Sequence, residues 1–408
     1  MQWLRLALLN IWRNGRRSLL LAFTLCIGNL ALLLFVGYIA ATLTGLREST
    51  IRAGLGHIQI GLQGQFDGYA DQPLQYGLTR DDQVRLEASL ESDAAVRRVV
   101  PRLVFSGLVS NGPRTLNFQG QGIHPGRERQ AFGAFQTLSA GVPLQAHDRN
   151  VYRALLGREM ARRLGVQPGD SVTVMSSTVS GAINAIDVEV AGLIATGIPE
   201  TELYSLQLPI EAAQELLRTD KLSYFAVLLN DSALSEATQA RIGLRLGHRY
   251  ELKGWQQLAP LYTQVLQLYR NQFVVFGSVI ALLVFLSVST MTLTTLFERA
   301  REIGTLRAMG ISSQTIRRLF VHEGWLLGLA SSLIGAGLAA IATVVINLLQ
   351  IELPPPPGRN SGVILHLLWL PEYVLPISLT LPLVAMLAAW WTSRRLGRLP
   401  IVSALAPA

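Results

Sequence analysis

Charged residues are scarce in this sequence, and lysine is almost absent. Of the 408 residues, 15% are charged and 50% are hydrophobic, and the mean hydropathy is +0.34. A chain this apolar is typical of a membrane protein and not of a soluble globular one. The only two lysines, Lys221 and Lys253, neither follow a glycine nor precede a serine or threonine, as the lysine of a phosphate-binding loop does. The sequence therefore predicts that this chain is not itself an ATPase.

Residues that form disulfides, metal sites and nucleophilic sites are also few or scattered. Cys26 is the single cysteine and lies in an apolar run, so no disulfide can form within the chain. The six histidines lack the spacing of metal ligands. Ser106 and Ser180, each followed by a glycine, are not in the G-x-S-x-G context of a nucleophile elbow. We expect no catalytic site, no metal site and no cofactor bound by this chain.

Much of the formal net charge of +8 lies beside long apolar runs. Positive charge next to membrane helices sets their orientation, so topology explains this charge better than a nucleic-acid partner does. The first apolar run, 18–43, follows a basic segment. A cleaved signal peptide is the alternative, but a run of about 25 residues is longer than the apolar core of a signal peptide and fits a membrane-spanning helix.

The sequence predicts an α-helical membrane protein with four spans and a large α/β domain between the first two. The spans are expected at 18–43, 272–297, 325–350 and 373–393. The other segments are a cytoplasmic amphipathic segment at 1–17, a periplasmic α/β domain with helix ends at 44–271, a cytoplasmic loop at 298–324, a periplasmic loop at 351–372 and a cytoplasmic tail at 394–408. Arginines at both ends and in the central loop place the two termini and that loop in the cytoplasm.

Between 44 and about 270 the pattern is that of a mixed α/β domain. No stretch there is long and apolar enough to span a membrane. Stretches rich in β-formers predict strands at 57–62, 103–109, 171–175, 188–195 and 224–229. Helical periodicity predicts helices at 80–90, 157–164, 210–217 and 232–246.

The second span belongs to an unusually long predicted helix. Pro260 suits a first helical turn, and no proline interrupts the pattern until well past Met309. Positions i, i+4, i+7 and i+11 are occupied by Leu261, Val265, Leu268 and Gln272. The helix is therefore expected to be on the order of 70 Å long, against a hydrocarbon core of roughly 30 Å. The alternative is a break near Asn271. The first helix is also expected to overrun its span, as far as Ile51.

Residues 298–324 form an arginine-rich segment between the second and third spans. Ile303, Leu306 and Met309 (or Ala308) share one face of a predicted helix. Gly310 is expected to end this helix, because glycine adopts a left-handed conformation without a Cβ penalty.

A second, short amphipathic helix is expected after that turn, with Ser312 or Ser313 as its cap. Its apolar face consists of Ile316, Leu319 and Phe320, and its basic face of Arg317 and Arg318. In the third span, small residues recur every three or four positions, which lets membrane helices approach closely. The glycines assigned to such packing are Gly324, Gly328 and Gly335.

The same segment resembles the signature of a transporter family. The motif E-R-x-R-E-I-G-x-L-R-A-x-G runs from Glu298 to Gly310, and I-x-x-L-F-x-x-E-G runs from Ile316 to Gly324. Both are similar to the FtsX/MacB-type ABC transporter permeases, which include the lipoprotein-releasing permeases. Residues 157–174 and 188–200 resemble, in the same order along the chain, parts of the extracytoplasmic core domain of that family.

The resemblance implies that the segment 298–324 carries a coupling helix that docks on a separate ATPase subunit. The residues that it assigns to this contact are Glu298, Arg299, Arg301, Glu302, Gly304, Arg307, Gly310, Ile311, Arg317 and Arg318. It also implies the bacterial inner membrane, an ATPase dimer that uses ATP, and a second permease copy in a homodimer or a paralogous heterodimer.

The layout of four spans without an ATPase on the same chain is closest to the lipoprotein-releasing permeases. The expected substrate is therefore a lipoprotein or lipid, with a periplasmic carrier as a further partner. Two alternatives stay open. One is an FtsX-like protein that signals to a cell-wall hydrolase, and the other is a MacB-like efflux permease for drugs or peptides. The large outer domain, of about 225 residues, favours transport over signalling.

Overall fold

The structure is a computed structural model that describes residues 15–66, 76–133, 138–145, 151–196, 198–354 and 363–394. Residues 1–14 of the segment 1–17 and residues 395–408 of the tail, both of which the sequence places in the cytoplasm, lie outside the described residues. The chain divides into two units. The helical unit consists of 1–44, 264–352 and 364–408, and the α/β unit of 45–263 and 353–363.

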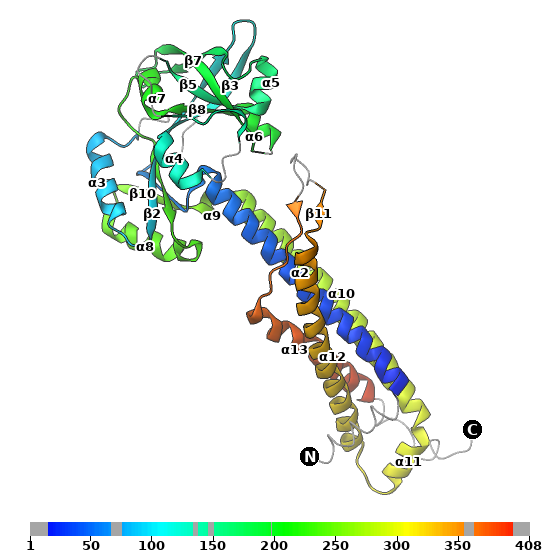
Figure 1. The fold of residues 1–408 in the computed structure, drawn as a ribbon. Coiled ribbons are helices and arrows are strands. Elements are labelled where there is room, and N and C mark those ends of the chain that lie inside the picture. The colour runs from blue at the N-terminus through cyan, green and yellow to red at the C-terminus, as the bar shows by residue number, and fades with distance from the viewer. Residues whose placement is uncertain are drawn as a thin grey trace. The chain divides into compact units, whose positions relative to one another are not determined.

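Among the residues that the structure describes, four helices are long and apolar enough to cross a membrane (Figure 1). They are α2 (Gly15–Thr50), α10 (Pro260–Glu298), α12 (Ser313–Leu349) and α13 (Pro371–Ser393). The predicted fold class, four spans and an α/β domain after the first, is therefore confirmed.

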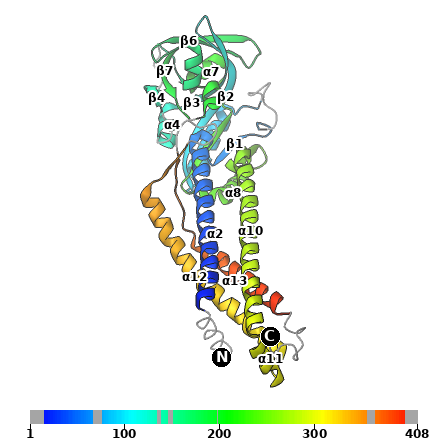
Figure 2. The ribbon, with the colours of Figure 1, turned by 90° about the vertical axis from the view of Figure 1, so that its right-hand side faces the viewer.

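The helical unit packs through apolar side chains and close glycine contacts. Phe35 and Tyr38 of α2 contact aromatic rings of α10, so the two helices run alongside each other (Figure 2). Gly324, Gly328 and Gly335 are buried, as expected for packing glycines. A Cβ at Gly335 would lie 2.7 Å from the carbonyl oxygen of Cys26 in α2, and one at Gly328 would lie 2.7 Å from Cα of Pro382 in α13.

A buried amide ties three helices of this unit together. Asn29 of α2 is fully buried, and its Nδ2 donates to the carbonyl of Ser332 in α12 at 2.8 Å and to Oγ of Ser378 in α13 at 3.1 Å. Interhelical hydrogen bonds of this kind stabilise membrane bundles, where lipid offers a polar side chain no other partner.

The lengths of the long helices correct the sequence prediction in two places. α10 runs without a break at Asn271, but it ends at Glu298, because Arg299 leaves the helical conformation with φ −100° and ψ 15°. The expectation of one continuous helix on the order of 70 Å, which would reach about Met309, was therefore wrong. The second helix after Gly310 is not short either, since α12 continues from Ser313 to Leu349. The overrun of the first helix is confirmed, because α2 reaches Thr50 and continues into a π-helical turn, η1 (Ile51–Leu55).

The α/β unit is built on one 10-stranded sheet. Its strands are β1 (Ile58–Leu62), β2 (Val96–Ser110), β3 (Thr115–Ile123), β4 (Leu138–Gly141), β5 (Arg153–Gly157), β6 (Ser171–Ser177), β7 (Ile183–Ile194), β8 (Ser205–Pro209), β9 (Tyr224–Leu229) and β10 (Tyr250–Gly254). Its helices are α3 (Arg80–Glu91), α4 (Pro125–Phe132), α5 (Arg158–Leu164), α6 (Pro199–Tyr204), α7 (Ile210–Leu217), α8 (Ser235–Leu246) and α9 (Trp255–Leu258), with a 3₁₀ turn η2 (Ser232–Leu234). A two-stranded pair, β11 (Glu352–Leu353) and β12 (Val363–Ile364), lies between α12 and α13 in the chain.

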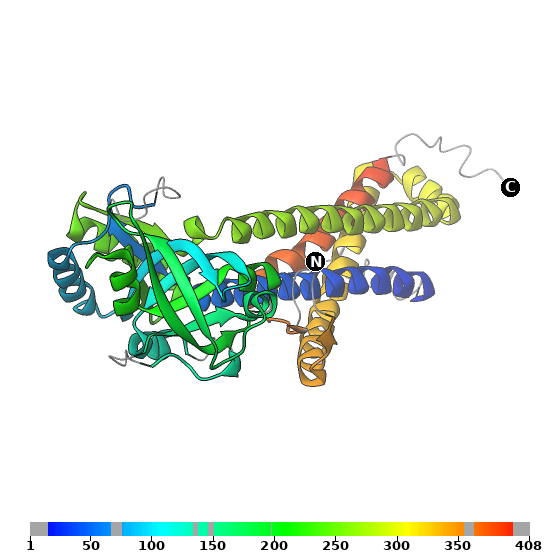
Figure 3. The same cartoon turned by 90° about the horizontal axis from the view of Figure 1, so that it is seen from above.

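Strand β2 is 15 residues long and takes part in two sheet regions (Figure 3). Its first half pairs with β9, which continues through β1 to β10. Its second half pairs with β3 and β6, and the ladder β3-β8-β5-β7-β6 returns to β2. These six strands form a closed ring, which leaves no free edge within it.

Where β2 pairs with β9, the sheet is covered on both faces. Neighbouring residues of a strand point to opposite faces, so Val99 and Val100 of β2 belong to different clusters. Val99 packs with Leu86 of α3 and Ile242 of α8. The opposite face forms a separate cluster, which consists of Ile51, Val100, Phe132, Leu228 and Trp255.

An ion pair without solvent access lies beside this second cluster. Arg102 of β2 is 0% exposed, and its guanidinium makes a two-pronged hydrogen bond to the carboxylate of Glu128 in α4. The guanidinium also lies 5.5 Å from the ring centre of Phe132. A buried pair is costly to break on one side only, because the remaining charge has no partner.

We therefore expect Arg102→Met to destabilise the protein by about 3–5 kcal/mol. The double variant Arg102→Met/Glu128→Gln removes the stranded charge and is expected to recover a large part of that loss. Thermal unfolding of the purified full chain in detergent measures both. Equal stability of the single and double variants would contradict the assignment of the loss to an unpaired Glu128.

Candidate functional site

The segment between α10 and α12 folds around a small apolar cluster. Helix α11 (Ala300–Ala308) begins after the break at Arg299. Its Ile303 is buried against Leu296 of α10 and Phe320 of α12, with Leu306 packed beside them. The prediction that Ile303 and Leu306 share the apolar face of α11 is confirmed. Met309, however, is 67% exposed, and Ala308 is exposed as well. The apolar face ends one turn earlier than the spacing predicted.

Gly310 ends α11 in the way that the sequence predicted. Its φ is +90°, and its N–H donates to the carbonyl of Arg307 at 3.0 Å. The next N–H, of Ile311, donates to the carbonyl of Leu306 at 3.1 Å, and these two side chains belong to the same cluster. This pair of hydrogen bonds with an apolar contact is the Schellman motif, which requires a left-handed residue at Gly310.

Ser312 then caps α12. Its Oγ accepts from the N–H of Thr315 at 3.3 Å and lies 2.9 Å from Oγ1 of the same residue. Of the two serines that the sequence offered, Ser312 is therefore the cap. α11 ends at Ala308 and α12 begins at Ser313, so two capped helix ends flank a turn of four residues.

The charged residues assigned to the ATPase contact differ in exposure. Arg301, Glu302 and Arg318 are exposed on α11 and α12, as is Gly310 at the turn. Arg299, Arg307, Arg317 and Ile311 are half-buried, and Gly304 is buried. Glu298 is exposed but forms an ion pair with Arg17 of α2, which joins the ends of α2 and α10. These residues therefore lie in one continuous segment, 298–318, and several of its charged side chains are exposed.

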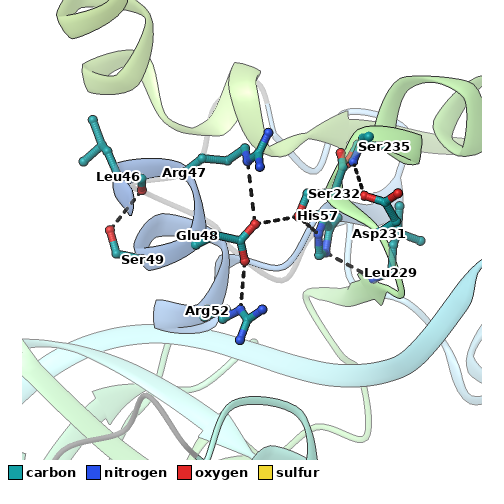
Figure 4. Close-up of polar contacts among 11 residues, drawn as sticks. Leu46, Arg47, Glu48, Ser49, Arg52, His57, Leu229, Asp231, Ser232 and Ser235 are labelled. Atoms are coloured by element: carbon teal, nitrogen blue, oxygen red, sulfur yellow. Dashed lines mark hydrogen bonds and ion pairs between the residues drawn. The ribbon is translucent and has the colours of Figure 1, made fainter. Parts of the chain in front are cut away.

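A second polar site lies in the α/β unit, where α2 ends (Figure 4). Glu48 of α2 accepts from Nε of Arg52 at 2.9 Å and from Oγ of Ser232 at 2.8 Å. Ser232 lies 2.9 Å from Nε2 of His57, and Nδ1 of His57 accepts from the N–H of Leu229 at 3.1 Å. Because Nδ1 is an acceptor, neutral His57 carries its proton on Nε2 and donates to Ser232. A continuous chain of hydrogen bonds therefore links the helix end to strand β9.

Burial keeps His57 neutral. It is 4% exposed, and desolvation lowers its pKa to about 4. The charges of Glu48 and Asp231 act against this shift, and those of Arg52 and Arg47 add to it. Little in the sequence indicates this site. Glu48 and Arg52 have the i, i+4 spacing of a helical ion pair, but Ser232 is 184 residues away from Glu48.

The start of α10 joins the same unit beside this network. Tyr262 packs edge-on against Trp255, with ring centres 4.7 Å apart. Trp255 belongs to the cluster that also holds Ile51, just after α2. Within the described residues, no three His, Cys, Asp or Glu side chains are grouped as a metal site would require.

Comparison with known families identifies the chain. A model described as "MacB-like periplasmic core domain" matches residues 18–243, which is more than half of the sequence, and one described as "FtsX-like permease C-terminal" matches 274–401. The chain belongs to the FtsX/MacB family of ABC transporter permeases. It is a multi-pass membrane protein, and the segment that includes α11 lies within the FtsX-like match.

Curated relatives of this permease are named as lipoprotein-releasing proteins. It is 26% identical over 250 residues to the lipoprotein-releasing system transmembrane protein LolC of Xylella fastidiosa, covering 60% of each chain. It is 22% identical over 266 residues to LolE of Haemophilus influenzae, covering 63% of this chain and 62% of the relative. The permease thus spans about 60% of the length of the relatives that it matches.

Among solved structures, the permease is similar to the periplasmic region of MacB from Actinobacillus actinomycetemcomitans. The match has 14% sequence identity and a TM-score of 0.36, and it covers 52% of this chain and 94% of that one.

Replacing Gly310 tests the role of the turn after α11. Gly310→Ala adds a Cβ at φ +90°, where no other atom lies within 4 Å, so the cost is backbone strain alone, about 1–2 kcal/mol. Hydrogen exchange of the peptide around Ile311 is expected to become faster by about five-fold or more. Gly337→Ala in α12 is the matched control, since nothing lies within 4 Å there either but the backbone is helical. Unchanged exchange in Gly310→Ala would contradict the strained turn.

The low pKa of His57 predicts a loss of stability in acid. The unfolded chain takes up the proton near pH 6.5 and the folded chain only near pH 4, so stability is complete above about pH 6.5 and falls by up to about 2–3 kcal/mol as the pH drops to 4. His57→Gln offers an acceptor for the N–H of Leu229 and a donor for Ser232, but it does not titrate. Its melting temperature is therefore expected to change less between pH 7 and pH 4.5 than that of the unmodified protein. Parallel pH profiles would contradict this assignment.

Proposed function

We propose that this permease works with a separate ABC ATPase in the cytoplasmic membrane of a bacterium and uses ATP-driven motion to extract or export an amphiphile, a lipoprotein or lipid. The observation that carries the proposal is the capped turn between α11 and α12, which lies within the match to the FtsX-like family. Family membership supports an ATPase partner, and the names of the curated relatives support lipoprotein release.

In this proposal α11 and the turn at Gly310 face the cytoplasm and receive the ATPase. The arginines of α11 and α12 support that orientation, because positive charge gathers on the cytoplasmic side of membrane helices. The exposed side chains of Arg301, Glu302 and Arg318 provide charged contacts for a partner. ATP is bound by the partner, and two permease copies face an ATPase dimer.

The long helices transmit the motion in this proposal. The break at Arg299 lets α11 tilt relative to α10, while α10 itself is uninterrupted from Pro260 to Glu298. Tyr262, at the start of α10, and Ile51 of η1, which continues α2, both pack into the cluster around Trp255. In this proposal a displacement of α11 is passed on along α10, which is one continuous helix.

Affinity purification of the detergent-solubilised chain, with mass spectrometry of the bound proteins, tests the proposal. We expect an ABC ATPase to co-purify and Arg307→Glu to lose most of it, because the variant reverses a charge within the contact. Arg270→Glu is the matched control, since it makes the same change in the half of α10 that is farther from α11, and it is expected to retain the ATPase. Bound lipoprotein or lipid in the same sample identifies the substrate.

The outcomes separate the candidate functions. Co-purification of a cell-wall hydrolase without lipid or lipoprotein favours the signalling alternative, and bound drug or peptide favours efflux. Absence of any ATPase under gentle conditions overturns the proposal.

A further inference from the structure

Helix α13 ends at the depth where phospholipid headgroups lie. It has 23 residues and is about 35 Å long, close to the roughly 30 Å of the hydrocarbon core. Tyr373, near its start, is 50% exposed, and Trp391, near its end, is 60% exposed. Exposed aromatic rings at both ends of a span are typical of the two membrane surfaces. Arg394, which directly follows α13, therefore lies at the level of the headgroups.

The side chain of Arg394 is stacked on the aromatic rings at this end. Its guanidinium carbon lies 3.7 Å from the ring centre of Trp390 and 5.8 Å from that of Trp391. A cation this close to an aromatic face is attracted to it. Stacking occupies the flat face of the guanidinium, so the N–H groups, which lie in its plane, remain available as donors. The rings thus hold a charged donor group in place at the membrane surface.

Within the part of the chain that the structure describes, no carboxylate balances this charge. Arg394 is exposed and forms no ion pair with a described Asp or Glu. Between Glu372, at the start of α13, and Ala408, the sequence contains no acidic residue but three arginines, Arg394, Arg395 and Arg398. Positive charge gathered at a membrane surface attracts lipids with anionic headgroups.

An exposed apolar stripe leads along α13 to the same point. Leu383, Leu387 and Trp391 are four residues apart and therefore share one face of the helix, and they are 44%, 52% and 60% exposed. The opposite face is buried, and its members include Leu381 and Ala385. A stripe that faces the hydrocarbon and ends at a fixed cation has the shape and polarity of a phospholipid, with acyl chains below an anionic head.

A phosphodiester suits the cation in geometry as well as in charge. The guanidinium presents pairs of parallel N–H donors, which bind two phosphate oxygens at once. The indole N–H of Trp391 is a further donor, on a side chain that is mostly exposed. Because the arginine is already stacked on Trp390, it loses little conformational freedom when a phosphate binds.

We infer that Arg394, stacked on Trp390, binds the phosphate of an anionic phospholipid whose acyl chains lie along Leu383 and Leu387. This lipid is a component of the surrounding membrane that stays bound to the helix, and it is distinct from any substrate that the permease moves. The inference requires only that α13 crosses the membrane. It is independent of the ATPase and of the proposed transport function.

Native mass spectrometry of the delipidated full chain in detergent tests the site. Phosphatidylglycerol and phosphatidylcholine with the same acyl chains are added separately, and the dissociation constant of the first bound lipid is measured for each. Both lipids carry a phosphodiester, but only phosphatidylglycerol has a net negative charge. We expect the unmodified chain to bind phosphatidylglycerol about ten-fold more tightly, the factor that one charged hydrogen bond contributes, and Arg394→Gln to lose most of this preference.

Three further variants separate the stacked site from general charge attraction. Arg394→Lys retains the charge without the two-donor fork and is expected to give an intermediate preference. Trp390→Leu retains Arg394 but removes the stack, and it is expected to weaken phosphatidylglycerol binding. Arg16→Gln is the matched control, since it removes the charge of another exposed arginine, at the start of α2, and is expected to keep the full preference. Melting temperatures of all variants check that the fold is intact.

The outcomes decide the inference without an ATPase or a substrate in the sample. An unchanged preference in Arg394→Gln would overturn it. Equal losses in Arg394→Gln and Arg16→Gln would also overturn it, because they indicate diffuse attraction and no defined site. Displacement of phosphatidylglycerol by an equal concentration of inorganic phosphate would indicate a site for free anions and contradict the assignment to a lipid.

Discussion

The hydrocarbon core of a membrane offers the backbone no hydrogen-bond partners, so a chain that crosses it does so as complete helices. About 20 residues are enough for one crossing. α2, α10 and α12 have 36, 39 and 37 residues, so each has a surplus of several turns. The extra turns of α10 begin beside Trp255, and those of α2 lead into η1, whose Ile51 belongs to the same cluster. The extra turns of α12 begin at the Ser312 cap. Because these helices are longer than one membrane crossing requires, their ends form part of the two sites described above.

The two sites are stabilised by different kinds of contact. The turn after α11 depends on backbone geometry, since the left-handed Gly310 allows two hydrogen bonds and the contact of Ile311 with Leu306. The end of α2 depends on polar side chains, through Glu48, Ser232 and His57. Both arrangements join a helix end to a neighbouring element by short contacts, which a transmitted displacement requires.

The sequence predicted features that depend on local pattern and missed those that depend on distant pairing. α7 and β9 have the predicted bounds, because helical spacing and a run of β-formers are local signals. β3 was missed, since its Thr115–Ile123 stretch mixes polar residues and glycines, and its place is set by pairing with β2 and β8. The break at Arg299 has no proline or glycine to reveal it. The link between Glu48 and Ser232 joins residues 184 apart, which no local pattern shows.

The central claim is that the turn after α11 touches an ABC ATPase. Photo-cross-linking in living cells tests it most directly, with a photoreactive amino acid in place of Met309, which is 67% exposed at that turn. The same replacement at Leu348, which is 77% exposed near the other end of α12, serves as the reference. We expect a covalent adduct with an ABC ATPase from position 309 and none from position 348. An adduct with another protein alone, or equal ATPase adducts from both positions, would contradict it.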